Sequence, residues 1–197
     1  SRSRLYVTKE AVRDFIQSRK DDSSDRYGYD RLGLVLYGGY AWTQCPLTLD
    51  YDVLELELER AHIDENNEEK SGKTAIGSAI GLAVLRLSES EAKSKVIILL
   101  TDGLNNAGDL DPITAAQLAK KYDMRVYTIG AGSAEEKAGK AFGLSAFFGS
   151  RHQPIDEKTL RKIAEETGGK YYRATDTDSL REAYAEINAL ETTEIEI

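Results

Sequence analysis

The sequence predicts an α/β domain with an open, mostly parallel sheet and helices on both faces. Two short, wholly apolar runs, "KVIILLTDG" and "RVYTIGAG", are typical of parallel strands that are buried on both faces. Segments with helical periodicity alternate with such strands, as they do in open α/β sheets. The chain has 197 residues and 41% hydrophobic content, which suits one compact core. We therefore predict a single domain over residues 1–197.

The first half of the chain is expected to hold two helices, a hairpin and a further helix. Leu5, Val12, Phe15 and Ile16 fall on one face of a helix over 4–19. The remaining elements expected here are a strand at 31–37, a Gly38-Gly39 turn, a strand at 40–45, a helix from the N-cap Asp50 through Arg60, and a helix over 75–88.

The second half is expected to alternate strands and helices. Asp111-Pro112 is an N-cap followed by proline at the first helical position, and Asp156 caps a later helix. Asp109 and Asp111 beside Asn105-Asn106 lack the spacing of an EF-hand, so turn and capping roles are predicted for them. The elements expected are strands at 95–101, from Arg125 and at 170–174, and helices at 111–122, 156–168 and 176–190, with an irregular segment at 131–153.

The composition excludes several functional classes. Lys+Arg 26 against Asp+Glu 34 gives a net charge of −8, which repels nucleic acid and anionic membranes and favours cations. A single cysteine, Cys45, excludes an internal disulfide and a Cys-rich zinc site, and His62 and His152 are too few for a multi-His metal site. No apolar run approaches the roughly 20 residues that span a bilayer, and no signal-peptide pattern opens the chain.

The stretch "KSGKTAIG" ends like the phosphate-binding loop of an ATPase. Such a loop needs G-x-x-x-x-G-K-[ST] directly after a buried strand, but Asn67 stands where the first glycine belongs. The preceding "HIDENNEEK" is acidic, and its carboxylates would repel a triphosphate. A nucleotide hydrolase is therefore the least favoured hypothesis.

Thr74 and Asp102 are a second interpretation of the same region. Thr74 lies at a helix start and Asp102 at a strand end, so both are expected at one edge of an open sheet. Hydroxyl and carboxylate oxygens suit Mg²⁺, Mn²⁺ or Ca²⁺ rather than zinc. The alternative is local: Thr74 as an N-cap and Asp102 as a turn former. Residue spacing alone leaves both open.

Four stretches carry a longer pattern: "RLGLVLYGGYAWTQCPLTLDYDVL", "GKTAIGSAI", "KSKVIILLTDGLNNAGDLDPITAAQLAKKYDMRVYTIGAG" and "IDEKTLRKIAEETGGKYYRATDTDSLREAYAEINALETTEI". In their order and spacing they resemble a von Willebrand factor A domain of the bacterial Bat-type (aerotolerance-operon) branch, which implies a Rossmann-like sheet. The resemblance implies a metal-ion-dependent adhesion site built from D-x-S-x-S, a threonine and an aspartate. Thr74 and Asp102 match the last two positions. The metal of that family, usually Mg²⁺, binds a carboxylate of a protein partner.

One departure from the family pattern is large: no D-x-S-x-S occurs in the 197 residues. "RLYVTKEAVRDFI" matches the first helix of the family, so we expect an N-terminally truncated domain that lacks the first, central strand. Ser1 and Ser3 mimic S-x-S without the aspartate. The sheet is then expected either to carry a gap between the strands at 31–37 and 95–101 or to be filled there by another segment, and the metal site is expected to be incomplete. The alternating tail "TTEIEI" is expected to be strand-like.

The leading functional hypothesis is a non-enzymatic protein–protein interaction module. The resemblance implies a membrane-anchored protein of the bacterial inner membrane, working with a MoxR-type AAA ATPase and other von Willebrand factor A proteins in a stress or assembly complex. The alternative is a structural interaction module with a vestigial metal site, whose contacts come from the segment 131–153 and the Trp42 hairpin.

Overall fold

The computed structural model describes residues 4–21, 30–62, 73–102, 104–131 and 155–195. Its helices and strands follow the predicted order. They are α1 Arg4–Asp21, β1 Leu32–Tyr37, β2 Ala41–Thr48, α2 Tyr51–Arg60, α3 Ile76–Ser88, β3 Val96–Thr101, α4 Pro112–Lys121, β4 Arg125–Ala131, α5 Glu157–Thr167, β5 Tyr171–Ala174 and α6 Thr177–Ile195. The predicted irregular segment falls almost wholly on 132–154, outside the described residues.

The strands form two separate hydrogen-bonded groups. β3, β4 and β5 make a parallel three-stranded sheet, and β1 pairs with β2 in an antiparallel hairpin. Within the described ranges no backbone ladder joins β1 to β3, so the expected gap in the sheet is confirmed for this part of the chain. A side chain crosses it: the Tyr37 hydroxyl donates to the Leu100 carbonyl oxygen at 2.6 Å.

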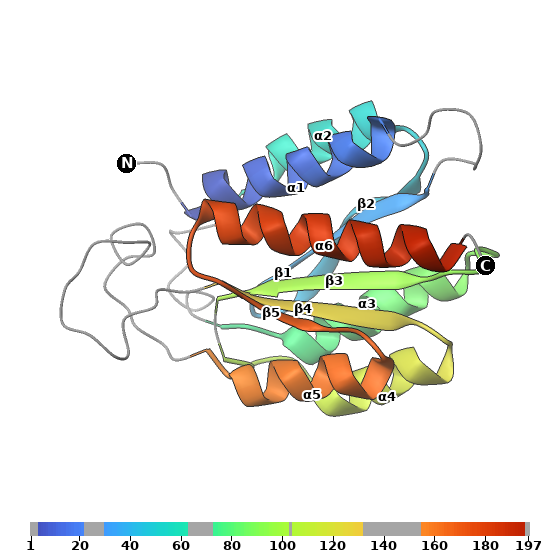
Figure 1. Ribbon diagram of the computed structural model, residues 1–197. Coiled ribbons are helices and arrows are strands. Elements are labelled where there is room, and N and C mark those ends of the chain that lie inside the picture. Colours follow the sequence, from blue (N-terminus) through green and yellow to red (C-terminus); the bar gives the residue numbers. More distant parts are fainter. Residues whose placement is uncertain (1–3, 22–29, 63–72, 103, 132–154, 196–197) are drawn as a thin grey trace.

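Helices cover both faces of the strands, which confirms the predicted fold class. Figure 1 shows α1 and α2 on one side and α4 and α5 on the other. Ile97 and Leu99 of β3 point into the core that α3, α4 and α5 cover, whereas Ile98 and Leu100 face α1 and α6. This alternation places apolar side chains on both faces of a parallel strand, as the continuous apolar run predicts. A third core joins α1 and α2 to the hairpin around Ile16, Cys45, Tyr51, Leu54 and Leu58.

Three predicted helix starts are confirmed. Asp50 accepts the Val53 N–H at 3.0 Å, and Asp111 and Asp156 cap α4 and α5 in the same way. The hydrogen bond from the Thr114 N–H stabilises the Asp111 carboxylate and holds its pKa below the usual value. Each contact lies three residues from its cap, so each could be predicted from local sequence.

The C-terminal tail differs from its prediction. Helix α6 continues to Ile195, so residues 192–195 are helical, and the strand-like interpretation was wrong there; 196–197 lie outside the described residues. The physical reason is Glu191, which is buried and whose carboxylate accepts a hydrogen bond from the Tyr127 hydroxyl at 2.6 Å. This contact carries the helix past the short alternating pattern. Among the described helices, none combines the length and apolarity that a membrane crossing needs.

Candidate metal centre

Thr74 lies just before α3, in backbone contact with the loop that follows β3. Its N–H donates to the Asn106 Oδ1 atom at 2.7 Å, and its carbonyl oxygen accepts the Asn106 N–H at 3.0 Å and the Ala107 N–H at 3.3 Å. The N-cap of α3 is Ala75, without a side-chain cap, so the alternative role of Thr74 as N-cap was wrong. The Asn105 Oδ1 atom accepts the Ile76 N–H at 2.8 Å instead.

The turn between β1 and β2 meets the same residues from the other side. The Ala75 N–H donates to the Gly38 carbonyl oxygen at 2.8 Å. The alkyl stem of Lys73 packs over Gly39, where an added Cβ would lie 3.5 Å from the Lys73 Cβ and Cδ atoms. The end of β1, the start of α3 and the loop after β3 therefore converge at one edge.

Asp102 follows the last residue of β3 and is exposed at this edge. Its carboxylate is close enough to Tyr37 to act on that side chain: burial raises the pKa of the Tyr37 phenol, and the charge of Asp102 raises it further. Thr74 is half-buried. The structure thus brings both sequence-predicted residues to the carboxyl ends of β1 and β3, which is where open α/β sheets bind ligands.

Gly108 closes the loop after β3 onto α3. Its φ is +87°, a left-handed conformation that favours glycine, and an added Cβ would lie 2.9 Å from the Ala75 Cβ atom. Asn105, Asn106 and Gly108 are site-forming residues whose contacts sequence reasoning missed. The signal available was the "NNAG" run itself, in which two amides and a glycine follow a strand end.

The donor set fits a hard divalent cation only in part. A threonine hydroxyl and a carboxylate are ligands that Mg²⁺, Mn²⁺ and Ca²⁺ accept, and water would fill the other positions. Over the ranges that the structure describes, no cluster of three or more His, Cys, Asp or Glu side chains is placed to hold a metal. Lys73, which is exposed beside Thr74, adds a positive charge that opposes a cation.

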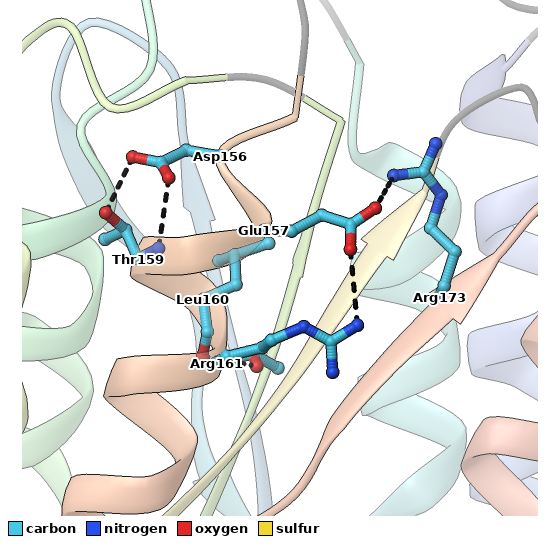
Figure 2. Close-up of polar contacts among 7 residues, drawn as sticks. Asp156, Glu157, Thr159, Leu160, Arg161 and Arg173 are labelled. Atoms are coloured by element: carbon cyan, nitrogen blue, oxygen red, sulfur yellow. Dashed lines mark hydrogen bonds and ion pairs between the residues drawn. The ribbon is translucent and has the colours of Figure 1, made fainter. Parts of the chain in front are cut away.

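Two acidic residues further along the same edge have other roles. β3, β4 and β5 align Thr101, Gly130 and Arg173 in one row, and Arg173 reaches the start of α5. Figure 2 shows the Glu157 carboxylate between Arg173 and Arg161, which it contacts at 2.5 and 3.3 Å. The Asp156 carboxylate accepts the N–H and hydroxyl of Thr159, as the same view shows. We therefore assign both carboxylates to structural roles.

A substitution series at Asn105 tests the cross-loop cap of α3. Asn105→Ala is expected to lower the free energy of unfolding by about 1 kcal/mol, because the Ile76 N–H loses its acceptor. Asn105→Asp keeps an acceptor at the positive end of the helix dipole and is expected to retain wild-type stability. Urea unfolding followed by circular dichroism measures both. Equal destabilisation by the two substitutions would contradict the capping role.

An open α/β sheet with a hydroxyl and a carboxylate at its carboxyl edge has the architecture of a ligand-binding module. The family model described as von Willebrand factor type A domain matches residues 1–186, and the chain belongs to this family. The predicted resemblance is thereby confirmed.

The relatives place the chain near the aerotolerance-related members. An uncharacterized protein of Borreliella burgdorferi is 29% identical over 204 residues, covering 100% of this chain and 55% of its own length. The chain thus spans about half the length of the curated relatives that it matches. Two solved structures, each 25% identical, are BatB from Bacteroides thetaiotaomicron, at a TM-score of 0.69, and an aerotolerance-related membrane protein from Bacteroides fragilis, at 0.65. They cover 96% and 93% of this chain, and 89% and 87% of their own.

A more distant structure shares the fold alone. Proximal thread matrix protein 1 from the mussel byssus is 18% identical, with a TM-score of 0.66 over 93% of this chain and 41% of its own. That structure has a zinc-occupied metal-ion-dependent adhesion site, which is a property of the mussel protein.

Proposed function

We propose that the chain is a non-enzymatic protein-interaction module that uses a divalent cation at Thr74 and Asp102 to bind a carboxylate of a protein partner. One observation carries this proposal: the backbone of Thr74 is hydrogen-bonded to the loop that continues from Asp102. This contact supports a site in which two hard oxygen donors, from segments far apart in sequence, lie at one edge of the sheet. No acid–base or nucleophilic constellation was predicted from the sequence.

The chain's own residues position the site, and the cation would supply charge and an open coordination position for the incoming carboxylate. The Thr74 hydroxyl and the Asp102 carboxylate would face the cation directly or through water. Asn106 holds the Thr74 backbone by two hydrogen bonds, so little ordering of this loop is left to the moment of binding. Mg²⁺ is the favoured ion, with Mn²⁺ and Ca²⁺ as alternatives of the same donor preference.

The setting that we propose is a membrane-associated complex with a MoxR-type AAA ATPase and other von Willebrand factor A proteins at the bacterial inner membrane. The similarity to an aerotolerance-related membrane protein supports the membrane association. The ATPase partner rests on the Bat-type resemblance, and co-purification from cells that express both proteins is the measurement that addresses it.

A structural interaction module with a vestigial metal site is the second candidate. The observation that favours it is the donor set, in which a single carboxylate stands beside the positive charge of Lys73. The Trp42 hairpin would then make the contacts. A nucleotide hydrolase would need a buried strand directly before its phosphate-binding loop. The last described element before Lys73 is instead helix α2, and residues 63–72 between them lie outside the described part.

Metal removal and Asp102→Ala test the leading proposal. Calorimetric titration with MgCl₂ and MnCl₂ is carried out on the chain and on a version extended by the residues that are encoded upstream of Ser1. Asp102→Ala is expected to weaken the binding of the cation by about tenfold or more, since loss of even an outer-shell partner weakens metal sites that much. EDTA is expected to abolish the binding of the partner.

Asp109→Ala is the matched control, because Asp109 is an exposed carboxylate in the same loop region. It is expected to leave the affinity for the cation unchanged. Heat release that is absent from both versions of the protein, or that persists in Asp102→Ala, would contradict the metal site and favour the vestigial alternative.

A further inference from the structure

An aromatic pair, Tyr40 and Trp42, lies at the turn that borders the candidate site. Tyr40 belongs to the turn between β1 and β2, and Trp42 is the second residue of β2. Their ring centroids are 5.3 Å apart and their planes are tilted by 41°. Tyr40 is 53% exposed, and among the described residues it is the one large exposed hydrophobic on the loops that form the candidate site.

The Trp42 side chain of the pair is held in position by its neighbours. The Trp42 Nε1–H donates to the Gln44 Oε1 atom at 3.2 Å, and the Gln44 Nε2 atom donates to the Glu57 carboxylate at 2.9 Å. Glu57 is itself paired with Arg60 at the end of α2. An aromatic surface that is ordered before binding loses little side-chain entropy on binding, and exposed tyrosine and tryptophan are the residues that interfaces favour.

Backbone hydrogen bonds join Tyr40, through Gly38, to Ala75, the residue after Thr74. The Gly38 N–H donates to the Tyr40 carbonyl oxygen at 2.9 Å, and the Gly38 carbonyl accepts the Ala75 N–H at 2.8 Å. Tyr40 and Thr74 therefore lie on two segments that are locked together. Lys73 packs its stem on Gly39 between them and is exposed.

The charges at this edge indicate what the aromatic pair would contact. The chain carries a net charge of −8, so an acidic partner segment is repelled by most of the surface. At the candidate site a bound cation, together with the exposed Lys73 ammonium, would reverse that sign locally, beside an exposed aromatic ring. A ligand that satisfies both features has a carboxylate with an apolar side chain next to it.

Resting on the proposed function, we propose that Tyr40 and Trp42 select a partner segment in which an acidic residue is followed by a large aliphatic side chain. The carboxylate binds at Thr74 and Asp102 with support from Lys73, and the aliphatic side chain packs on the Tyr40 ring. Thr74 and Asp102 thus determine that a carboxylate binds, and the aromatic pair determines which carboxylate binds best.

Trp42 is the only tryptophan in the chain, so its fluorescence emission reports directly on binding next to the aromatic pair. The probes are acetyl-Gly-Asp-Leu-Gly-amide and acetyl-Gly-Asp-Gly-Gly-amide, titrated in MgCl₂ into the chain and into the upstream-extended version. We expect the leucine peptide to bind about threefold to tenfold more tightly, as partial burial of one leucine side chain predicts. Tyr40→Ala is expected to remove this preference while leaving the binding of the glycine peptide unchanged.

Tyr122→Ala is the matched control, because Tyr122 is 48% exposed at the end of α4, on a segment that makes none of the contacts at this edge. It is expected to keep the preference for leucine. Equal affinity for the two peptides, or a preference that survives Tyr40→Ala, overturns the role of the aromatic pair and leaves the metal site standing. Binding that is absent, or that ignores both EDTA and Asp102→Ala, overturns the proposed function and this inference with it.

Discussion

Gly77→Ala is expected to lower the free energy of unfolding by about 3 kcal/mol or more, the upper part of the range for overpacking a core. A Cβ on Gly77 would overlap the Leu110 carbonyl oxygen and lie 2.8 Å from the Leu110 carbonyl carbon and 2.9 Å from that of Asp111. These are backbone atoms at the entry to α4, so rotation of a side chain cannot relieve the overlap. The helices α3 and α4 would have to move apart.

Gly81→Ala is the matched control, one turn further along α3. Its Cβ would lie 2.7 Å from the Leu110 Cδ2 atom, which is the end of a flexible side chain. Alanine is also about 1 kcal/mol better than glycine within a helix, which offsets part of the crowding. Gly81→Ala is therefore expected to stay within about 1 kcal/mol of wild type. Urea unfolding of the two variants checks this, and equal effects would show that backbone contact does not limit the approach of the helices.

Glu191→Ala is expected to lower the free energy of unfolding by about 2–4 kcal/mol, because a buried polar network loses its carboxylate. Glu191 is 4% exposed. It accepts the Tyr127 hydroxyl at 2.6 Å and the Ser94 hydroxyl at 3.3 Å, and its carboxylate lies 3.2 Å from the Arg125 guanidinium. Tyr127 is itself buried, so its hydroxyl would be left without this acceptor inside the core.

Glu186→Ala on the same helix supplies the control. Glu186 is paired with Lys170 at the surface, and both side chains are about half exposed. Surface ion pairs contribute about 0–1 kcal/mol, so little change is expected. Chemical denaturation gives the stabilities, and hydrogen exchange at the last turns of α6 locates the effect. A Glu191→Ala variant as stable as Glu186→Ala would refute the anchoring role of the buried carboxylate.

The order of helices and strands was predictable because its signals are local. The aspartate caps of α2, α4 and α5 each contact a backbone N–H three residues away. The apolar run before Asp102 predicted a strand buried on both faces, and the structure places its side chains in cores on opposite sides. The gap beside β3 was predicted from the family pattern, and no property of the individual strands would have shown it.

The candidate site was only partly predictable because its framework is not local. Thr74 and Asp102 were predicted at one edge of the sheet, and the structure brings their segments together. The contacts that do so join Asn105 to Ile76 and Asn106 to Thr74, across 29 and 32 residues of sequence. The prediction for residues 192–195, which form the last turn of α6, failed for a related reason: the buried Glu191 just before them finds its partners on β4 and before β3.

Because no backbone ladder joins β1 to β3 within the described residues, the contacts of Thr74 help to connect the hairpin to the three-stranded sheet. Sliding of the hairpin past the three-stranded sheet would break no ladder within the described residues. It would, however, strain the bonds that run from the Gly38 turn through Ala75 and Thr74 to Asn106. A ligand that binds Thr74 and Asp102 together would therefore link the hairpin to the three-stranded sheet. A force applied to the hairpin would then be transmitted through Thr74 to the bound partner.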